Sequence, residues 1–330
     1  MKKILQSLLD YESFDKIKAK QVLIDLTQND YPATQIASFL TIFIMRGVTL
    51  EELKGFREAL LELCIPIHLG TQEVIDVCGT GGDSKNTFNI STLTAFILAG
   101  AEIPVAKHGN YGVTSISGSS TVLQTLGISF TNSEDLLRKQ LEKAHLCFMH
   151  APLFHPALKS VANIRKELQI KTFFNVLGPL INPAQPLYQF HGVFSLELAR
   201  MYHFLLQQEN KKYFVYYTLD GYDEISLTSE WKFFSHYTEG IQYPYDLGLD
   251  FVHPEELKGG NSAQESADIF MNILKGQGSL AQNQVLIANA ALAIQLYKNC
   301  DFDTAKNIAE DSLFNLKALQ KFEILKSLNV

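Results

Sequence analysis

Val74-Ile-Asp-Val-Cys-Gly-Thr-Gly-Gly-Asp-Ser-Lys-Asn-Thr-Phe-Asn-Ile-Ser-Thr92 is the stretch that decides the fold of this sequence. Residues 74–78 are a short apolar run that predicts a buried strand, and residues 93–101 predict a helix. The glycines at positions 79, 81 and 82 separate them, and glycine lets backbone N–H groups approach a ligand without a Cβ in the way. A strand, a glycine turn and a helix N-terminus together predict a phosphate site, because the turn supplies N–H donors and the helix end supplies partial positive charge.

The polar residues of this stretch are more numerous than a tight turn between two apolar segments needs. The Walker A pattern is absent, since no Gly-Lys-Ser/Thr follows the glycines, and the Gly-x-Gly-x-x-Gly dinucleotide pattern fails because Asp83 and Ser84 follow Gly82. The stretch is therefore interpreted as a phosphate loop of another type. Its polar residues are Asp83, Lys85, Asn86, Thr87, Asn89, Ser91 and Thr92.

Upstream of this loop, residues 1–65 show helical periodicity throughout. Pro32 is expected at the first position of a third helix, and Thr49 with Glu52 predicts a capping box at the start of a fourth. The apolar residues of the region 39–45 leave two interpretations open, which are core packing and a dimer interface. Residues 1–65 are therefore predicted to form a small helical domain.

Downstream, from residue 71, short apolar strands alternate with amphipathic helices. This alternation is typical of an α/β fold with a mostly parallel sheet, so residues 71–330 are expected to form the larger domain. Sites in such sheets lie at the carboxyl ends of the strands, which makes 79–91, 107–119 and 220–226 the candidate site loops. The other expected strands are 103–107, 146–149, 188–194 and 213–219, and the expected helices are 133–144, one beginning near 156, 196–208, 262–274, 280–297 and 302–316.

Charge and composition limit the partners that this chain can have. The net charge of −7 at neutral pH disfavours nucleic acid and an anionic membrane surface as partners. Neither a signal peptide nor an apolar run long enough to span a bilayer is recognised, and the four cysteines are scattered without Cys-x-x-Cys spacing. The expected location is the cytoplasm, and a phosphate ligand has to be met by local positive charge or by a metal.

The two later loops carry side chains that suit a phosphate and its metal. Lys107 is followed by glycines and hydroxyls, a composition typical both of a phosphate or ribose site and of a flexible surface loop. Asp223 and Glu224, with a hydroxyl such as Ser91, would suit Mg²⁺, although an Asp-Glu dipeptide is usually a solvated turn. Arg165 could pair with a substrate carboxylate or form an exposed salt bridge.

Taken together, the motifs resemble those of the anthranilate phosphoribosyltransferase family of tryptophan biosynthesis. The matching pieces are Asp-x-Cys-Gly-Thr-Gly-Gly-Asp, Thr-Phe-Asn-Ile-Ser-Thr, Lys-His-Gly-Asn, Asp-Glu and Asn-x-Leu-Gly-Pro-Leu-x-Asn-Pro, and they cover nearly the whole chain. The resemblance implies a nucleoside phosphorylase-like fold and a homodimer formed through the helical domain, with part of residues 160–185 packed on that domain. It also implies transfer of the phosphoribosyl group of 5-phosphoribosyl 1-pyrophosphate (PRPP) to the amine of anthranilate, without a covalent nucleophile.

The resemblance further implies roles for individual residues. A pair of Mg²⁺ ions in each subunit is expected on Ser91, Asp223 and Glu224, and the backbone N–H groups of residues 79–83 are expected to stabilise charge on the pyrophosphate. The residues implied for anthranilate are Gly79, His108, Asn110 and Arg165. The residues implied for PRPP are Gly79, Gly82, Asp83, Thr87, Asn89, Ile90, Ser91, Thr92, Lys107, His108, Gly109, Asn110, Gly112, Ser115 and Ser119.

Three positions depart from the family pattern. Tyr111 and Lys171 each stand where the family has arginine. The loop reads Val113-Thr114-Ser115 where the family commonly has two serines. Because Tyr111 removes a cation beside a polyanion, the phosphate has to be met elsewhere, for example by Lys85. Two alternatives remain: a pyrimidine nucleoside phosphorylase-like enzyme, which would not need a metal on the Asp-Glu pair, and a non-catalytic nucleic-acid-binding relative, which would need a basic face.

Overall fold

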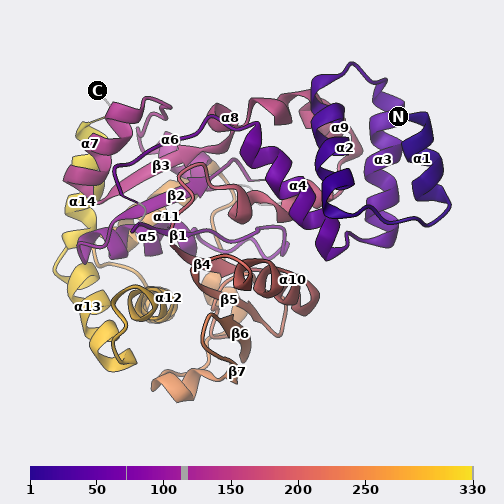
Figure 1. Ribbon diagram of the computed structural model, residues 1–330. Coiled ribbons are helices and arrows are strands. Elements are labelled where there is room, and N and C mark those ends of the chain that lie inside the picture. Colours follow the sequence, from indigo (N-terminus) through magenta and orange to yellow (C-terminus); the bar gives the residue numbers. More distant parts are fainter. Residues whose placement is uncertain (72, 113–117, 329–330) are drawn as a thin grey trace.

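The computed structural model describes residues 1–71, 73–112 and 118–328, and it shows a helical bundle at one end of an α/β body (Figure 1). A later helix, α9 (Lys159–Leu168), packs against the bundle by contacting α2 and α3. The bundle therefore includes a segment that is distant in the sequence. Its own helices are α1 (Lys2–Leu9), α2 (Lys16–Gln28), α3 (Ala33–Arg46) and α4 (Leu50–Glu62).

Local sequence signals set the ends of these helices. Asp15 caps α2 by accepting a hydrogen bond from the Lys18 N–H at 2.7 Å. The predicted capping box of α4 is confirmed, because Thr49 Oγ1 accepts from the Glu52 N–H at 3.3 Å and the Glu52 carboxylate accepts from the Thr49 N–H at 2.9 Å. The prediction for Pro32 is wrong by one residue, since its ψ of 138° is extended and the helix begins at the next residue.

A seven-stranded sheet forms the centre of the α/β body, in the order β3-β2-β1-β4-β5-β6-β7. Neighbouring strands from β3 to β5 pair in parallel, and β6 and β7 add an antiparallel edge. The chain proceeds in opposite directions from β1 and from β4, so their junction is the switch point at which such sheets bind ligands. The strands are β1 (Ile75–Val77), β2 (Val105–Gly109), β3 (Leu146–His150), β4 (Tyr188–Gly192), β5 (Lys212–Thr218), β6 (Trp231–Ser235) and β7 (Glu239–Gln242).

The five predicted strands are present, but the β6–β7 hairpin was not predicted. β7 is four residues long, contains Gly240, and alternates exposed with half-buried positions, so it lacks the apolar run that identifies a buried strand. The helix expected at 302–316 also differs from the structure. Leu316 adopts a φ of +59°, which is left-handed, so the chain breaks there into two helices.

Helices cover both faces of the sheet (Figure 1). The helix after the glycine turn begins at Ile90, three residues earlier than expected, so Ser91 and Thr92 lie in its first turn. The remaining helices are α5 (Ile90–Gly100), α6 (Ser119–Thr125), α7 (Glu134–Ala144), α8 (Ala151–Phe154), α10 (Leu196–Gln207), α11 (Ala263–Leu274), α12 (Leu280–Lys298), α13 (Phe302–Phe314) and α14 (Lys317–Ser327).

One apolar cluster joins the bundle to the α/β body. It contains Phe56 of α4, Phe173 and Tyr202, the last of which belongs to α10. The rings of Phe56 and Phe173 are stacked, with their centroids 4.5 Å apart. Because the cluster is shared, residues 161–181 are held between the two parts of the molecule.

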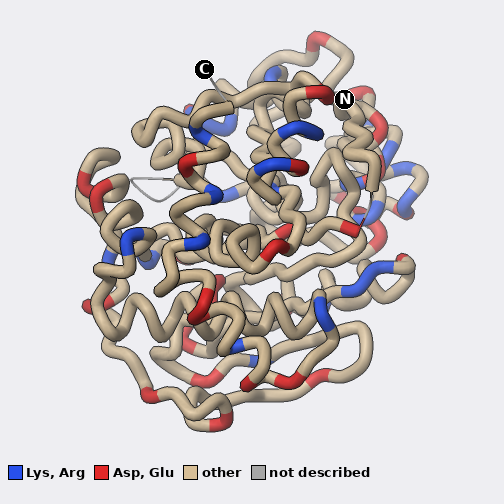
Figure 2. Tube along the Cα trace, turned by 90° about the vertical axis from the view of Figure 1, so that its left-hand side faces the viewer, with Lys and Arg blue, Asp and Glu red and all other residues tan. Residues whose placement is uncertain are grey.

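Segments of both charge signs are interspersed in Figure 2, and the coloured part of that view contains no continuous basic stripe. This distribution does not provide the basic face that a nucleic-acid-binding relative would need. In the part of the chain that the structure describes, no helix combines the length and the apolarity that a membrane crossing requires.

Candidate active site

A cavity of about 240 Å³ lies where the carboxyl ends of β1 and β2 meet the loop that follows β5. Among the predicted site residues, Ser115 lies outside the described residues, and all the others line this one cavity. The structure thus brings together loops that are distant in the sequence, such as those of Gly81 and Asp223, which are 142 residues apart. Lining residues that the sequence analysis did not assign to a ligand include Ala151, Leu158, Phe174, Asn175, Gly178 and Ile181.

The backbone N–H groups of the glycine loop donate hydrogen bonds to the protein on both sides of the loop. The Phe88 N–H donates to the Leu257 carbonyl at 3.0 Å, on the side of α5. On the other side, the Thr80 N–H donates to the Gly192 carbonyl at 2.9 Å and the Gly81 N–H donates to Asp223 Oδ2 at 2.6 Å. These last two N–H groups are therefore engaged within the protein in this structure, and the contact of the N–H groups of residues 79–83 with a phosphate stays a prediction.

The side chain of Lys107 links β2 to the end of β1 and to the start of α5. Its side chain is almost fully buried, and its Nζ donates to the Val77 carbonyl and lies 3.4 Å from Ser91 Oγ. The ammonium therefore sits beside the first turn of α5, whose N-terminal residues line the cavity. A buried cation and a helix N-terminus at one place favour an anionic ligand.

The carboxyl groups on the opposite side have strongly perturbed acidities. Burial, together with the nearby charge of Asp83, raises the pKa of Asp223 to about 8. Burial and the charge of Asp223 raise the pKa of Glu224 well above its ordinary value. Glu224 Oε2 is buried and has no hydrogen-bond partner among the described residues. The charge of Lys107 lowers the pKa of Glu224 and only partly offsets burial, so both carboxyl groups favour their protonated forms until a further cation is bound.

Contacts from two elements fix the backbone that carries this carboxyl pair. Thr218 Oγ1, at the end of β5, donates to the Glu224 carbonyl at 2.6 Å. On α12, the buried Asn289 side chain pairs with both backbone groups of Ile225, through its Nδ2 at 2.9 Å and its Oδ1 at 3.3 Å. The carboxyl groups are therefore held in place by the sheet and by a core helix.

This donor set fits a divalent cation. The residues that line the cavity carry three carboxyl groups, Asp83, Asp223 and Glu224, against the cations Lys107 and Arg165. Among the described residues, no group of three or more His, Cys, Asp or Glu could hold a metal by itself. A cation here would complete its shell with ligand phosphates and water, as Mg²⁺ commonly does.

The other side of the cavity presents one cation over an aromatic ring. The half-buried Arg165 lies with its guanidinium carbon 5.2 Å from the centroid of the Phe174 ring, and burial lowers the pKa of Arg165. No ion pair of Arg165 occurs within the described residues, so the alternative of an exposed salt bridge is not realised there. Its planar donors remain available for a ligand carboxylate.

His108 has a defined tautomer. Its Nδ1 lies 2.9 Å from the Gly178 carbonyl, and because a carbonyl only accepts, Nδ1 carries the proton. Burial, with the neighbouring His155 as a second cause, lowers the pKa of His108 to about 3, so the ring is neutral at pH 7. Its Nε2 is then an acceptor, and it has no partner among the described residues.

Of the three departures from the family pattern, residues 113–115 lie outside the described residues, and Tyr111 and Lys171 make different contacts. Tyr111 lines the cavity, and its ring packs edge-on against His150 with the centroids 4.8 Å apart. Lys171 donates through Nζ to the carbonyl of Gly82 and so connects the segment after α9 to the glycine loop. Lys85, the cation expected to substitute for an arginine, instead lies over the Tyr222 ring at 4.6 Å.

Comparison with known proteins defines the class first. A model described as the glycosyl transferase family a/b domain matches residues 71–319, and a model of that family's helical bundle domain matches residues 2–64. Together they make this chain a member of the glycosyl transferase family that joins a helical bundle to an α/β domain.

Individual relatives and solved structures define the family within this class more closely. Anthranilate phosphoribosyltransferase of Flavobacterium johnsoniae is 52% identical, over 98% of this chain and 99% of that relative. The crystal structure of anthranilate phosphoribosyltransferase from Thermus thermophilus matches with a TM-score of 0.90 at 27% identity, over 98% of each chain. The Saccharomyces cerevisiae enzyme in complex with PRPP and Mg matches with a TM-score of 0.90 at 26% identity, over 98% of this chain and 96% of that one. The chain belongs to the anthranilate phosphoribosyltransferase family.

Proposed function

We propose that this protein transfers the phosphoribosyl group of PRPP to the amine of anthranilate and releases pyrophosphate, as a cytoplasmic step of tryptophan biosynthesis. The observation that carries the proposal is the division of one cavity into two chemically different sides. Lys107, the α5 N-terminus and the pair Asp223–Glu224 suit a metal-bound polyphosphate, whereas Arg165 over the ring of Phe174 suits a small aromatic carboxylate.

On the donor side, the chain's own residues bind and orient the leaving group. Lys107 and the first turn of α5 would bind the phosphates, and Ser91, Asp223 and Glu224 would hold Mg²⁺; all of them line the cavity. Bound Mg²⁺ supplies neutralisation of charge on the pyrophosphate. The unpartnered Glu224 oxygen and the raised pKa of Asp223 support this assignment, because a cation would relieve both.

On the acceptor side, the ring and the amine must meet C1 of the ribose. An arylamine is neutral at pH 7, so its nitrogen lone pair can form the bond to C1 while the bond from C1 to the pyrophosphate oxygen breaks and the nitrogen loses a proton. Arg165 would pair with the carboxylate, and the acceptor Nε2 of His108 suits an amine N–H. Positioning of this kind can supply several of the ~7–11 kcal/mol available from orientation.

The test is the fluorescence of anthranilate in the presence of the protein, PRPP and Mg²⁺. We expect a decrease only when all three are present, with formation of N-(5-phosphoribosyl)anthranilate and pyrophosphate. A parallel assay with a pyrimidine nucleoside and phosphate examines the alternative activity. Phosphorolysis without added Mg²⁺, and no reaction with anthranilate, would overturn the proposal.

The same proposal includes a homodimer formed through residues 1–65. The structure supports it with apolar side chains left exposed on α1 and α3, two helices that contact each other: Met45 is 84% exposed and Leu9 is 61% exposed. Phe39 and Phe43, by contrast, are buried in the core. Light scattering should give twice the mass of one chain, and Met45→Glu should give the mass of one.

A further inference from the structure

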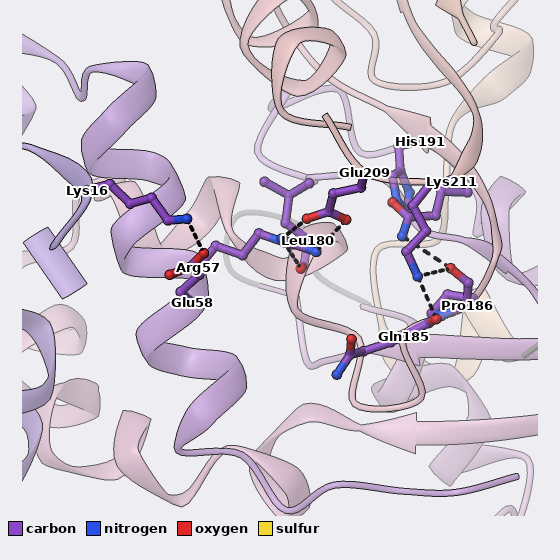
Figure 3. A network of polar contacts seen from close by, with 10 residues as sticks. Lys16, Arg57, Glu58, Leu180, Gln185, Pro186, His191, Glu209 and Lys211 are labelled. Atoms are coloured by element: carbon purple, nitrogen blue, oxygen red, sulfur yellow. Dashed lines mark hydrogen bonds and ion pairs between the residues drawn. The ribbon is translucent and has the colours of Figure 1, made fainter. Parts of the chain in front are cut away.

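We propose that Arg57, in the helical bundle, is a positioning residue that fixes the acceptor side of the cavity. This inference rests on the proposed function, since it concerns how tightly the aromatic acceptor is bound. Arg57 belongs to α4 and lies outside the cavity, so it acts through the segment that it holds. Figure 3 shows Arg57 reaching from α4 to both Leu180 and Glu209.

The contacts of Arg57 are directional and largely buried. Its Nε donates to the Leu180 carbonyl at 2.8 Å, and both terminal nitrogens contact the carboxylate of Glu209, one of them at 3.0 Å. The exposed fractions of the Arg57 and Glu209 side chains are 11% and 28%. A two-pronged pair with a carboxylate fixes the plane of a guanidinium, so Nε can point only at the carbonyl that it now holds.

That carbonyl belongs to the turn that supports His108. Leu180 lies in the 3₁₀ turn η3 (Gly178–Ile181), and the two ends of η3, Gly178 and Ile181, line the cavity. The Gly178 carbonyl accepts the hydrogen bond from His108 Nδ1 that sets the tautomer of the ring. Arg57 therefore holds the same short turn that orients His108, two residues away.

The residues that follow η3, from Asn182 to Pro186, are held by the α/β body instead. Asn182 Nδ2 donates to Asp76 at 2.8 Å, and Lys211 Nζ donates to the carbonyls of Gln185 at 2.7 Å and Pro186 at 2.9 Å. Lys211 follows Glu209 closely in the chain. Loss of Arg57 would thus remove the hydrogen bond that holds η3 at Leu180 and leave the residues after η3 fixed.

This arrangement predicts a selective effect. The hydrogen bonds of Arg57 go to Leu180 and Glu209, not to the glycine loop or the carboxyl pair, so PRPP binding should depend on Arg57 little. Arg57→Met should raise the KM for anthranilate roughly tenfold, as expected when a charge-assisted hydrogen bond that orders a site is lost. Glu209→Gln should have a smaller effect, because it leaves the bond to Leu180 in place.

Two controls separate positioning from stability. Lys16 and Glu58, beside Arg57 in Figure 3, form an ion pair within the bundle whose side chains are 42% and 37% exposed, so Glu58→Gln should leave both KM values unchanged. Leu23→Ala removes a fully buried side chain from the bundle core and keeps Arg57 itself unchanged. It should lower the melting temperature at least as much as Arg57→Met and leave the KM for anthranilate unchanged.

The experiment measures both KM values, kcat and the melting temperature for the full-length protein and these four variants. If Arg57→Met does not fold, Arg57→Lys, which keeps the charge but not the two-pronged geometry, takes its place. A rise confined to anthranilate supports the proposal. Equal rises for both substrates, no rise, or an equal rise in Leu23→Ala would overturn it. Absence of reaction in the wild-type protein would instead contradict the proposed function.

Discussion

The two sides of the cavity are fastened to different parts of the molecule. The donor side is built from loops of the α/β body that hold one another, as when the Gly81 N–H donates to Asp223. The acceptor side is built on α9 and the turns after it, which share an apolar cluster with the helical bundle. The donor side is thus formed within one part of the molecule, whereas the acceptor side depends on how two parts pack.

The two sides also treat charge differently. On the donor side, burial raises the pKa of Asp223 to about 8, and a bound cation would stabilise the ionised carboxylate. On the acceptor side, burial lowers the pKa of His108 to about 3 and that of His155 to about 4, so these rings stay neutral. We therefore expect changes on the donor side to affect the binding of metal and phosphate, and changes on the acceptor side to affect the binding of the aromatic acceptor and packing.

The largest effect should come from removing the donor-side carboxyl pair. Asp223→Ala combined with Glu224→Ala should lower kcat by roughly 10²–10³-fold or more, the range seen when preorganised electrostatic contacts are lost. The fold should survive, because the change removes two carboxyl groups that burial already disfavours. Steady-state rates over a series of Mg²⁺ concentrations, with a melting curve, test this. Unchanged activity at limiting Mg²⁺ would refute the donor-side assignment.

The difference between the two sides explains what the sequence could predict. The proposed donor residues Asp83 and Asp223 belong to short polar motifs in the loops after β1 and β5, and Lys107 lies near the end of β2; strand ends converge at one edge of a parallel sheet. Leu158 and Phe174 look like any core residue in the sequence, and only tertiary packing turns them toward the cavity.

Main-chain geometry was equally hidden from the sequence. Nothing in a row of glycines shows that the Thr80 and Gly81 N–H groups donate to Gly192 and Asp223, because those partners are set by the neighbouring strands. The Asn-x-Leu-Gly-Pro-Leu-x-Asn-Pro motif was noticed, yet its role in holding His108 through Gly178 follows only from the fold.

A second test of the donor side concerns the glycine loop. Gly82 has a φ of +81°, and a Cβ there would lie 3.4 Å from Lys171 Cε, which is an ordinary contact. Gly82→Ala should therefore strain the loop and hinder ligand approach, weakening PRPP binding roughly a hundredfold while the melting temperature changes by only a few degrees. Gly248→Ala, with a φ of +65° and open space around it, is the matched control. Normal titration of PRPP by Gly82→Ala would show that this loop does not cradle the phosphate.

On the acceptor side, Arg165→Ala should act on one substrate. Its guanidinium has a ring beneath it and no ion-pair partner within the described residues, so its proposed partner is the carboxylate of anthranilate. The KM for anthranilate should rise about tenfold or more and that for PRPP should change little. Arg165→Lys keeps the charge without the planar guanidinium, so its KM for anthranilate should lie between those of the wild type and Arg165→Ala. Equal changes for both substrates would assign Arg165 a structural role.

Acid should weaken the packing of the acceptor side. The folded-state pKa of His155 lies below its ordinary value of 6.5, so its contribution to stability is present above pH 6.5 and is lost as the pH falls toward 4. This amounts to about 1.4 kcal/mol per pH unit in that window. Asp76, whose pKa is raised to about 6, acts in the opposite direction, losing its contribution as the pH rises from 3.8 through 6.

Comparison of a variant with the wild type isolates the histidine. His155→Leu should show a smaller drop in melting temperature between pH 7.5 and 5.5, an interval chosen to span the ordinary histidine pKa of about 6.5. Urea unfolding at the two pH values gives the same difference as a free energy. An identical drop in the variant and the wild type would mean that His155 is not a source of the acid sensitivity.

The smallest effect should come from Tyr111→Arg, which adds a cation to the donor side. Tyr111 lines the cavity but is 45% exposed, and its hydroxyl donates to Gln124 at 3.3 Å. An exposed ion pair is worth about 0.2–1 kcal/mol, so PRPP should bind only a few-fold more tightly. The gain should shrink as salt is added, because exposed charges are screened over roughly 8–10 Å at ordinary ionic strength.

Two further variants keep this test specific. Tyr111→Phe removes only the hydroxyl, and Tyr111→Gln removes the ring contact with His150 without adding charge. Calorimetric titration of PRPP at two salt concentrations should give a salt-dependent gain for Tyr111→Arg alone. A gain that all three variants share would come from releasing the ring rather than from charge. No gain in any variant would mean that the side chain at position 111 points away from the phosphates.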